Sequence, residues 1–231
     1  PRNINTTLYE QIIFDPNINS IEKQRYMTTV ETNFLIMGSN YSITYRPTVK
    51  PFSKNQFIIS GGVDWGGNLL SLLGKKDAAD TTKAKAFLGV PILQYAKFDG
   101  DIRYYRTISP TIKWANRFVG GIGIPYGNSR NGVLPQFKQY FAGGSIGIRS
   151  FRARALGPGA YNSDTASVKL FGYSSFGDIR LELNSEIRVK FTDIINMAFF
   201  VDAGNIWTIK KNETAGYDEE SLFKKNSFIK Q

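Results

Sequence analysis

Cysteine and histidine are both absent from the 231 residues. Their absence excludes a disulfide framework, cysteine or histidine metal sites, and catalytic triads that use histidine. Long apolar runs are missing too: no stretch comes near the roughly eighteen consecutive apolar residues that a membrane-spanning helix needs. The sequence therefore excludes a helical span. Low mean hydropathy is also typical of membrane-crossing β-strands, because only every second side chain of such a strand is apolar.

Side-chain alternation is the strongest positive signal. From Asp178 to Phe191, apolar residues occupy nearly every second position, and charged residues with one amide occupy the positions between them. This period of two is typical of a β-strand with one apolar and one polar face, because a helix would scatter the same residues around its axis. The same pattern predicts further strands over Gln24–Met37, Tyr41–Val49, Asn55–Trp65, Lys97–Arg106, Thr111–Phe118 and Ala198–Trp207, with a weaker candidate over Leu8–Phe14.

The lengths of these strands and of their connections favour a membrane protein. Several strands have a dozen residues or more, against about five or six in soluble proteins. Tight turns at 46–51 and 106–110 are interspersed with long polar loops at 74–85 and 210–224. We therefore expect an all-β fold, a transmembrane antiparallel β-barrel with short periplasmic turns. A soluble sandwich is the alternative, because alternation is compatible with it, but the dense charge on the polar face favours a water-filled lumen.

The formal net charge is +10. A nucleic-acid or anionic-lipid surface is one interpretation of such an excess. The basic residues are spread along the chain, however, which favours a polar lumen and solvated loops. Four aromatic residues could stack on bases: Tyr104, Tyr105, Trp114 and Trp207. They are better explained as interfacial aromatics of a membrane protein, so we expect no nucleic-acid partner.

The segment 126–175 is too long for a plain connection, because loops beyond about fifteen residues are usually functional or disordered. Its composition is not that of a disordered segment. It holds the glycine pair Gly143-Gly144, the run Ile148-Arg149-Ser150-Phe151, and Gly157-Pro158-Gly159. We expect these glycines and the proline to determine the shape of the loop.

The stretch FAGGSIGIRSFRARALGPGAY resembles the characteristic loop of the BamA/TamA outer-membrane superfamily, whose usual core is Val-Arg-Gly-Phe or Val-Arg-Gly-Tyr. Ile148, Arg149 and Phe151 match that core, and Ser150 replaces its glycine. LELNSEIRVKF, with Glu186, and FFVDAGNIW, with Asp202, resemble two later strands of the family. FDGDIRYYRTISP and GGIGIPYGNS resemble the strands that precede the loop. These blocks follow in family order, roughly from Tyr95 to Trp207.

The resemblance implies a barrel of about sixteen strands in the full protein, with 126–175 as a long extracellular loop that enters the lumen. We expect residues 1–231 to be a single barrel domain, incomplete at both ends, because the chain begins at Pro1 without a signal-peptide pattern and ends on what looks like another strand. Strand parity places Glu186 and Asp202 on polar faces, where Arg149 of a lumenal loop would reach both carboxylates. We call Arg149, Ile148, Phe151, Glu186 and Asp202 the loop latch. A solvated loop arginine is the alternative.

The family implies a bacterial outer-membrane assembly factor that helps β-barrel proteins fold and insert. Its partners would be the outer-membrane bilayer and unfolded outer-membrane clients, and it would need no catalytic residues, cofactor or metal. The run IRSFRARALGPGAY looks more like the TamA/TamL branch, which implies a TamB-like periplasmic partner, with Bam-type partners as the alternative. A two-partner-type secretion transporter and a passive porin are the rival functions.

Overall fold

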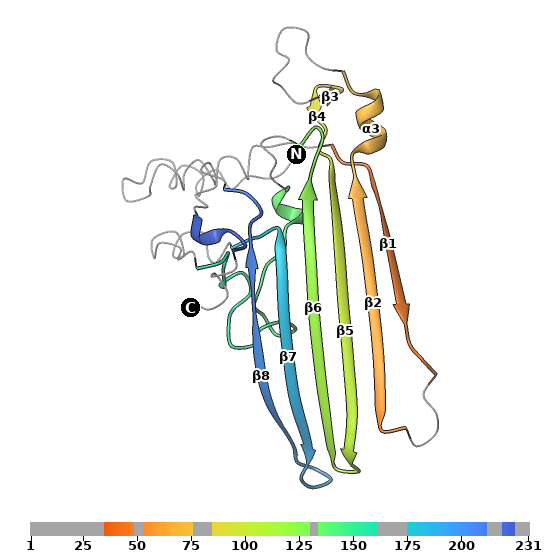
Figure 1. The fold of residues 1–231 in the computed structure, drawn as a ribbon, viewed down its shortest axis with the longest axis vertical. Coiled ribbons are helices and arrows are strands. Elements are labelled where there is room, and N and C mark those ends of the chain that lie inside the picture. The colour runs from red at the N-terminus through yellow and green to blue at the C-terminus, as the bar shows by residue number, and fades with distance from the viewer. Residues whose placement is uncertain are drawn as a thin grey trace.

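The computed structural model describes residues 35–48, 53–75, 85–129, 134–160, 175–211 and 219–224. In these residues the chain forms one six-stranded antiparallel sheet and a two-stranded one. The large sheet has the order β1-β2-β5-β6-β7-β8 (Figure 1). Its strands are β1 Gly38–Tyr45, β2 Asn55–Gly66, β5 Tyr95–Ser109, β6 Ile112–Pro125, β7 Ile179–Lys190 and β8 Asn196–Trp207.

Smaller elements lie between the long strands. The helix α3 (Asn68–Leu73) and the hairpin of β3 (Ala86–Phe87) and β4 (Val90–Pro91) connect β2 to β5, at the upper end of the sheet in Figure 1. Two short 3-10 helices cover Gln136–Lys138 and Glu219–Ser221. None of the helices in the described ranges is long and apolar enough to cross a bilayer.

The all-β class is confirmed. The strands predicted over 97–106 and 111–118 were too short, whereas the one predicted over 41–49 extends past the end of β1 at Tyr45. β5 continues to Ser109, so the turn predicted at 106–110 is reduced to two residues, and β6 runs on to Pro125. The strand predicted over Gln24–Met37 is wrong at its end, because 35–37 lie outside the sheet apart from a single bridge at Leu35. Its earlier part and the candidate at 8–14 lie outside the described residues. No helix was predicted over 68–73.

One face of the sheet is apolar and open. Directly paired residues of neighbouring strands lie on the same face, so the registers carry this surface across all six strands. The middle of β8 illustrates it: Val201 is 72% exposed and pairs with Ser185 of β7. Exposed apolar side chains of this face are Tyr41, Ile43, Tyr45, Phe57, Ile59, Trp65, Phe98, Ile102, Phe118, Ile122, Leu183, Ile187, Met197, Phe199 and Val201.

The opposite face is polar and charged, and the segment 134–160 lies against it. That segment is the teal trace beside β7 and β8 in Figure 1. Charged and amide side chains of this face are Asp64, Lys97, Asp99, Asp101, Arg103, Arg117, Arg180, Glu182, Asn184, Glu186, Arg188 and Asp202. A small core forms where the segment meets β8, from Tyr140, Ala142, Ile148 and Ile206.

Aromatic residues of the apolar face gather in two groups. Tyr104 stacks on Phe57 and meets Trp114 edge-on, near the short-turn end of the sheet. Near the other end, Tyr41 stacks on Trp65. The remaining two interfacial predictions were wrong. Tyr105 pairs with Ala115 on the polar face, and Trp207 is buried and packs edge-on against Phe223.

Candidate functional site

The guanidinium of Arg149 binds carboxylates from two neighbouring strands. Its Nε donates to Asp202 Oδ2 at 2.8 Å, and its Nη2 donates to Asp202 Oδ1 at 2.9 Å. Its Nη1 donates to Glu186 Oε2. The backbone N–H of Arg149 also donates to Asp202 Oδ2, at 3.1 Å. A bidentate, charge-assisted pair of this kind determines the position and the orientation of the arginine.

The surroundings of this cluster restrict it further. Asn184 donates through Nδ2 to Asp202 Oδ1 at 3.0 Å and to the Gly147 carbonyl at 2.9 Å. The Phe200 ring lies under the guanidinium, 3.8 Å from Arg149 Cζ, which adds a cation–π contact. The hydrogen bond with Asp202, above all, raises the pKa of Arg149 above its ordinary value. The arginine therefore keeps its charge at any physiological pH.

The two other loop residues of the predicted latch differ in position. Ile148 is buried in the core that Tyr140, Ala142 and Ile206 complete, so it holds the loop by apolar packing. Phe151 remains half exposed, and the structure does not bring it to the carboxylates. Ser150, at the position where the family has glycine, is exposed in a turn.

The glycines singled out in the loop have backbone conformations that favour glycine. At Gly143, φ is +89°, and an added Cβ would lie 2.3 Å from the Arg152 carbonyl oxygen. Such a conformation is readily adopted only by glycine. Gly144, Gly157 and Gly159 also have positive φ, and Pro158 follows Gly157 through a cis peptide bond.

A buried ion pair beside the latch was missed. Glu182 of β7 is 1% exposed and receives two bonds from Arg180, at 2.9 and 2.7 Å. The loop passes directly over it: a Cβ on Gly147 would lie 3.1 Å from both carboxylate oxygens. Strand parity placed Glu182 on the polar face, but no signal in the sequence indicates which carboxylate the loop crosses.

A second contact holds the start of the segment on β2, several strands away from the latch. Lys138 Nζ donates to Asp64 Oδ2 of β2 at 2.8 Å, and Tyr95 donates its hydroxyl to Asp64 Oδ1 at 3.0 Å. Next to it, Lys97 Nζ lies 4.1 Å from the centre of the Tyr140 ring. We call the Lys138–Asp64 pair the β2 anchor. The segment is thus held on the polar face by β2 as well as by β7 and β8.

Glycines of β6 make room for the segment between the two attachments. A Cβ on Gly121 would lie 2.7 Å from Tyr140 Cζ, and one on Gly123 would lie 2.6 Å from Leu134 Cδ2. Burial raises the pKa of the Tyr140 hydroxyl. The segment 134–160 therefore lies on the glycine-rich run of β6.

The arrangement is suited to holding a loop in place. Within the part of the chain that the structure describes, no three carboxylates gather as they would around a metal ion. Every charged group of the latch is occupied by a neighbour of opposite charge. What the site supplies is the position of 134–160 on a charged face.

These features define an all-β protein of long antiparallel strands, with one open apolar face and one polar face that carries a tethered loop. Residues 82–228 match the Omp85 superfamily domain. The chain belongs to the Omp85 superfamily. It is also similar to the outer membrane protein assembly factor BamA of Neisseria meningitidis serogroup B (strain ATCC BAA-335 / MC58), with 22% identity over 243 residues, 90% of this chain and 29% of that protein. The chain thus spans less than a third of that relative's length. The superfamily prediction is confirmed, and the comparisons do not separate its BamA and TamA branches.

Proposed function

We propose that this chain is part of the transmembrane barrel of an outer-membrane protein assembly factor, which helps other β-barrel proteins fold and insert. The observation that carries the proposal is the pairing of two faces: an open apolar face, and a polar face on which Arg149 holds a loop. Superfamily membership and the similarity to an assembly factor support it. The protein would reside in the bacterial outer membrane and need no covalent chemistry.

The apolar face fits a bilayer in its dimensions. The two aromatic groups are separated along β2 by the eight positions from Phe57 to Trp65. At about 3.3 Å per residue, this is about 26 Å along the strand. Strands of membrane barrels tilt by about 40°, so the height between the groups is about 20 Å, near the roughly 25 Å apolar band of such barrels. Water would have to cover this face in a soluble protein, at a large free-energy cost.

In this proposal the polar face lines the barrel lumen, and the latch fixes segment 134–160 inside it. The charged face tolerates water, and the buried carboxylate of Asp202 requires a cation. The loop would hold the wall of the lumen in one shape while a client strand pairs at an exposed sheet edge, where backbone N–H and C=O groups are free to bond.

The test uses the full-length protein in liposomes and an unfolded outer-membrane barrel as client. We expect the client to fold faster with the protein than in empty liposomes, as measured by its heat-modifiable mobility on gels. Unchanged client folding would contradict the proposal. A large steady conductance in planar bilayers would favour a porin, and export of a partner protein without faster client folding would favour a secretion transporter.

We further propose that the protein belongs to the TamA-like branch and works with a TamB-like periplasmic partner. Only the run from Ile148 to Tyr161 supports this choice. Purification of the tagged protein from its own membranes tests it. Recovery of a TamB-like protein is expected, and recovery of a complete set of Bam-type subunits instead would contradict it.

A further inference from the structure

The helix α3 exposes leucines that its surroundings do not cover. Leu70 is buried, but Leu69, Leu72 and Leu73 are exposed, and Leu72 is 82% exposed. The three exposed residues follow a spacing of three and four, so they form one apolar stripe on the helix. A stripe of leucines facing water is unfavourable, whereas the same stripe facing acyl chains is favourable.

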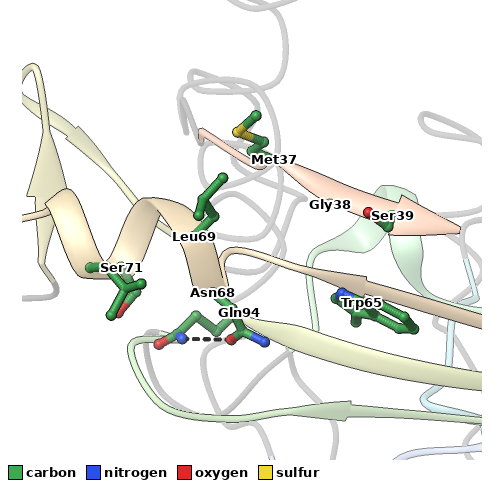
Figure 2. A pocket seen from close by; sticks show the side chains of 9 residues that line it. Met37, Gly38, Ser39, Trp65, Asn68, Leu69, Ser71 and Gln94 are labelled. Atoms are coloured by element: carbon green, nitrogen blue, oxygen red, sulfur yellow. Dashed lines mark hydrogen bonds between the residues drawn. The ribbon is translucent and has the colours of Figure 1, made fainter.

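An open groove separates this helix from the start of β1. Figure 2 shows Leu69 pointing towards Met37, with Trp65 further along the groove. Asn68 and Gln94 form a polar side, joined by a hydrogen bond of 2.9 Å from Gln94 Nε2 to Asn68 Oδ1. The groove therefore combines apolar walls with a polar rim.

The groove is continuous with the apolar face of the sheet. Trp65 lines it and also stacks on Tyr41 in the upper aromatic group of that face, with ring centres 5.4 Å apart. Such aromatic groups mark the boundary between acyl chains and headgroups. α3 follows β2 directly, so its leucines lie at this boundary, at the end of the sheet away from the short turns at 110–111 and 191–195 (Figure 1).

The charged residues that the structure describes around the groove are basic. The described residues of this cap, 67–75 and 85–94, include two lysines and no acidic residue. Lys85 Nζ lies 3.2 Å from the carbonyl oxygen of Ser71, which lines the groove, and it makes no ion pair with any described residue. Lys75 lies near Lys85, because its backbone pairs with Ala86, the residue that follows Lys85. An ammonium group beside an apolar groove is suited to a lipid that carries a phosphate on its headgroup.

We propose that this groove binds a phosphate-bearing, acylated glycolipid of the outer leaflet, of the lipid A type. One acyl chain would lie along Met37, Trp65, Leu69 and Leu72, and a headgroup phosphate would meet Lys85. The glycolipid is preferred over a glycerophospholipid because short turns are periplasmic in such barrels, which places the cap in the outer leaflet. This inference rests on the membrane orientation in the proposed function.

Native mass spectrometry of the full-length protein in detergent, with diphosphorylated hexa-acyl lipid A as the probe, tests the groove. The double variant Leu69→Ser/Leu72→Ser should bind the lipid about tenfold more weakly, as expected for the loss of contact with about one leucine side chain. Lys85→Gln should weaken binding about fivefold, and it should not change the binding of the same lipid without phosphates. Leu88→Ser, on the β3–β4 turn, and Lys54→Gln, at the opposite end of the sheet, are the matched controls and should bind like wild type.

Wild-type binding by the double variant would overturn the proposal, and so would an equal loss with Leu88→Ser. Equal competition by phosphatidylglycerol would overturn the assignment to a glycolipid. If the double variant does not fold, as judged by heat-modifiable mobility, the lipid binding of Lys85→Gln compared with that of wild type tests the groove instead. Client folding in liposomes is measured on the same preparations. Lipid binding without client folding would contradict the proposed function alone, and client folding without lipid binding would contradict the groove alone.

Discussion

Replacing Arg149 with alanine should open the loop without unfolding the sheet. The variant removes the bidentate pair with Asp202 and the bond to Glu186. The carboxylate of Asp202, whose side chain is only 2% exposed, keeps the amide of Asn184 and one backbone N–H. Because the stranded charge retains these two donors, we expect a loss of about 2–3 kcal/mol, below the upper range for a broken buried pair. That corresponds to a roughly 30- to 150-fold increase in loop opening.

Hydrogen exchange of the segment 143–153, followed by mass spectrometry in the full-length protein, measures this opening. The matched control is Arg188→Ala. Arg188 binds the other oxygen of Glu186 but is 60% exposed, so its loss should cost less than about 1 kcal/mol. Adding Asp202→Asn to Arg149→Ala should restore part of the protection, because the stranded charge is gone. Exchange within twofold of wild type in Arg149→Ala would refute the role of the latch, as would an equal effect of Arg188→Ala.

Three further variants test the surroundings of the latch. Lys138→Ala breaks the β2 anchor, and because the pair is partly exposed we expect about 1 kcal/mol less protection at 134–140, with exchange at 147–151 unchanged; uniform loss would contradict two separate attachments. Gly121→Ala should displace the Tyr140 ring above it and destabilise the segment 134–160 by about 1–3 kcal/mol. Gly120→Ala should not, because its Cβ would make only ordinary contacts. Protease sensitivity of the segment measures the difference. Val201→Arg on the apolar face should lower stability in lipid by about 2–4 kcal/mol, and Ala198→Arg on the polar face should not; equal urea midpoints in lipid vesicles would contradict the assignment of faces.

Strand parity accounts for what could be predicted from the sequence. Alternation from Asp178 to Phe191 predicts β7 within one residue at each end. It also places Glu186 and Asp202 on the polar face, and the resemblance of the loop supplies Arg149. The three side chains belong to segments with recognisable local patterns, which is why their meeting could be expected from the sequence alone.

The parts that were missed depend on contacts that have no local pattern. The second half of β6 carries glycines instead of alternating side chains, because Tyr140 and Leu134 occupy that space. The β2 anchor joins residues 74 positions apart, and nothing near Lys138 indicates a partner on β2. The helix α3 is six residues of mostly leucine, and so short an apolar run has no period that separates helix from strand.

In the proposed arrangement, one face of the sheet meets lipid while the other lines a lumen. Because this chain has no cysteine, single cysteines for spin labels can be placed at Val201 and Ala198 in a full-length protein otherwise free of cysteine. Electron paramagnetic resonance in liposomes then compares the collision of each label with oxygen, which dissolves in lipid, and with a water-soluble nickel complex. We expect the label at Val201 to collide mainly with oxygen and the label at Ala198 to collide mainly with the nickel complex. Equal access of the nickel complex to both labels would contradict this arrangement.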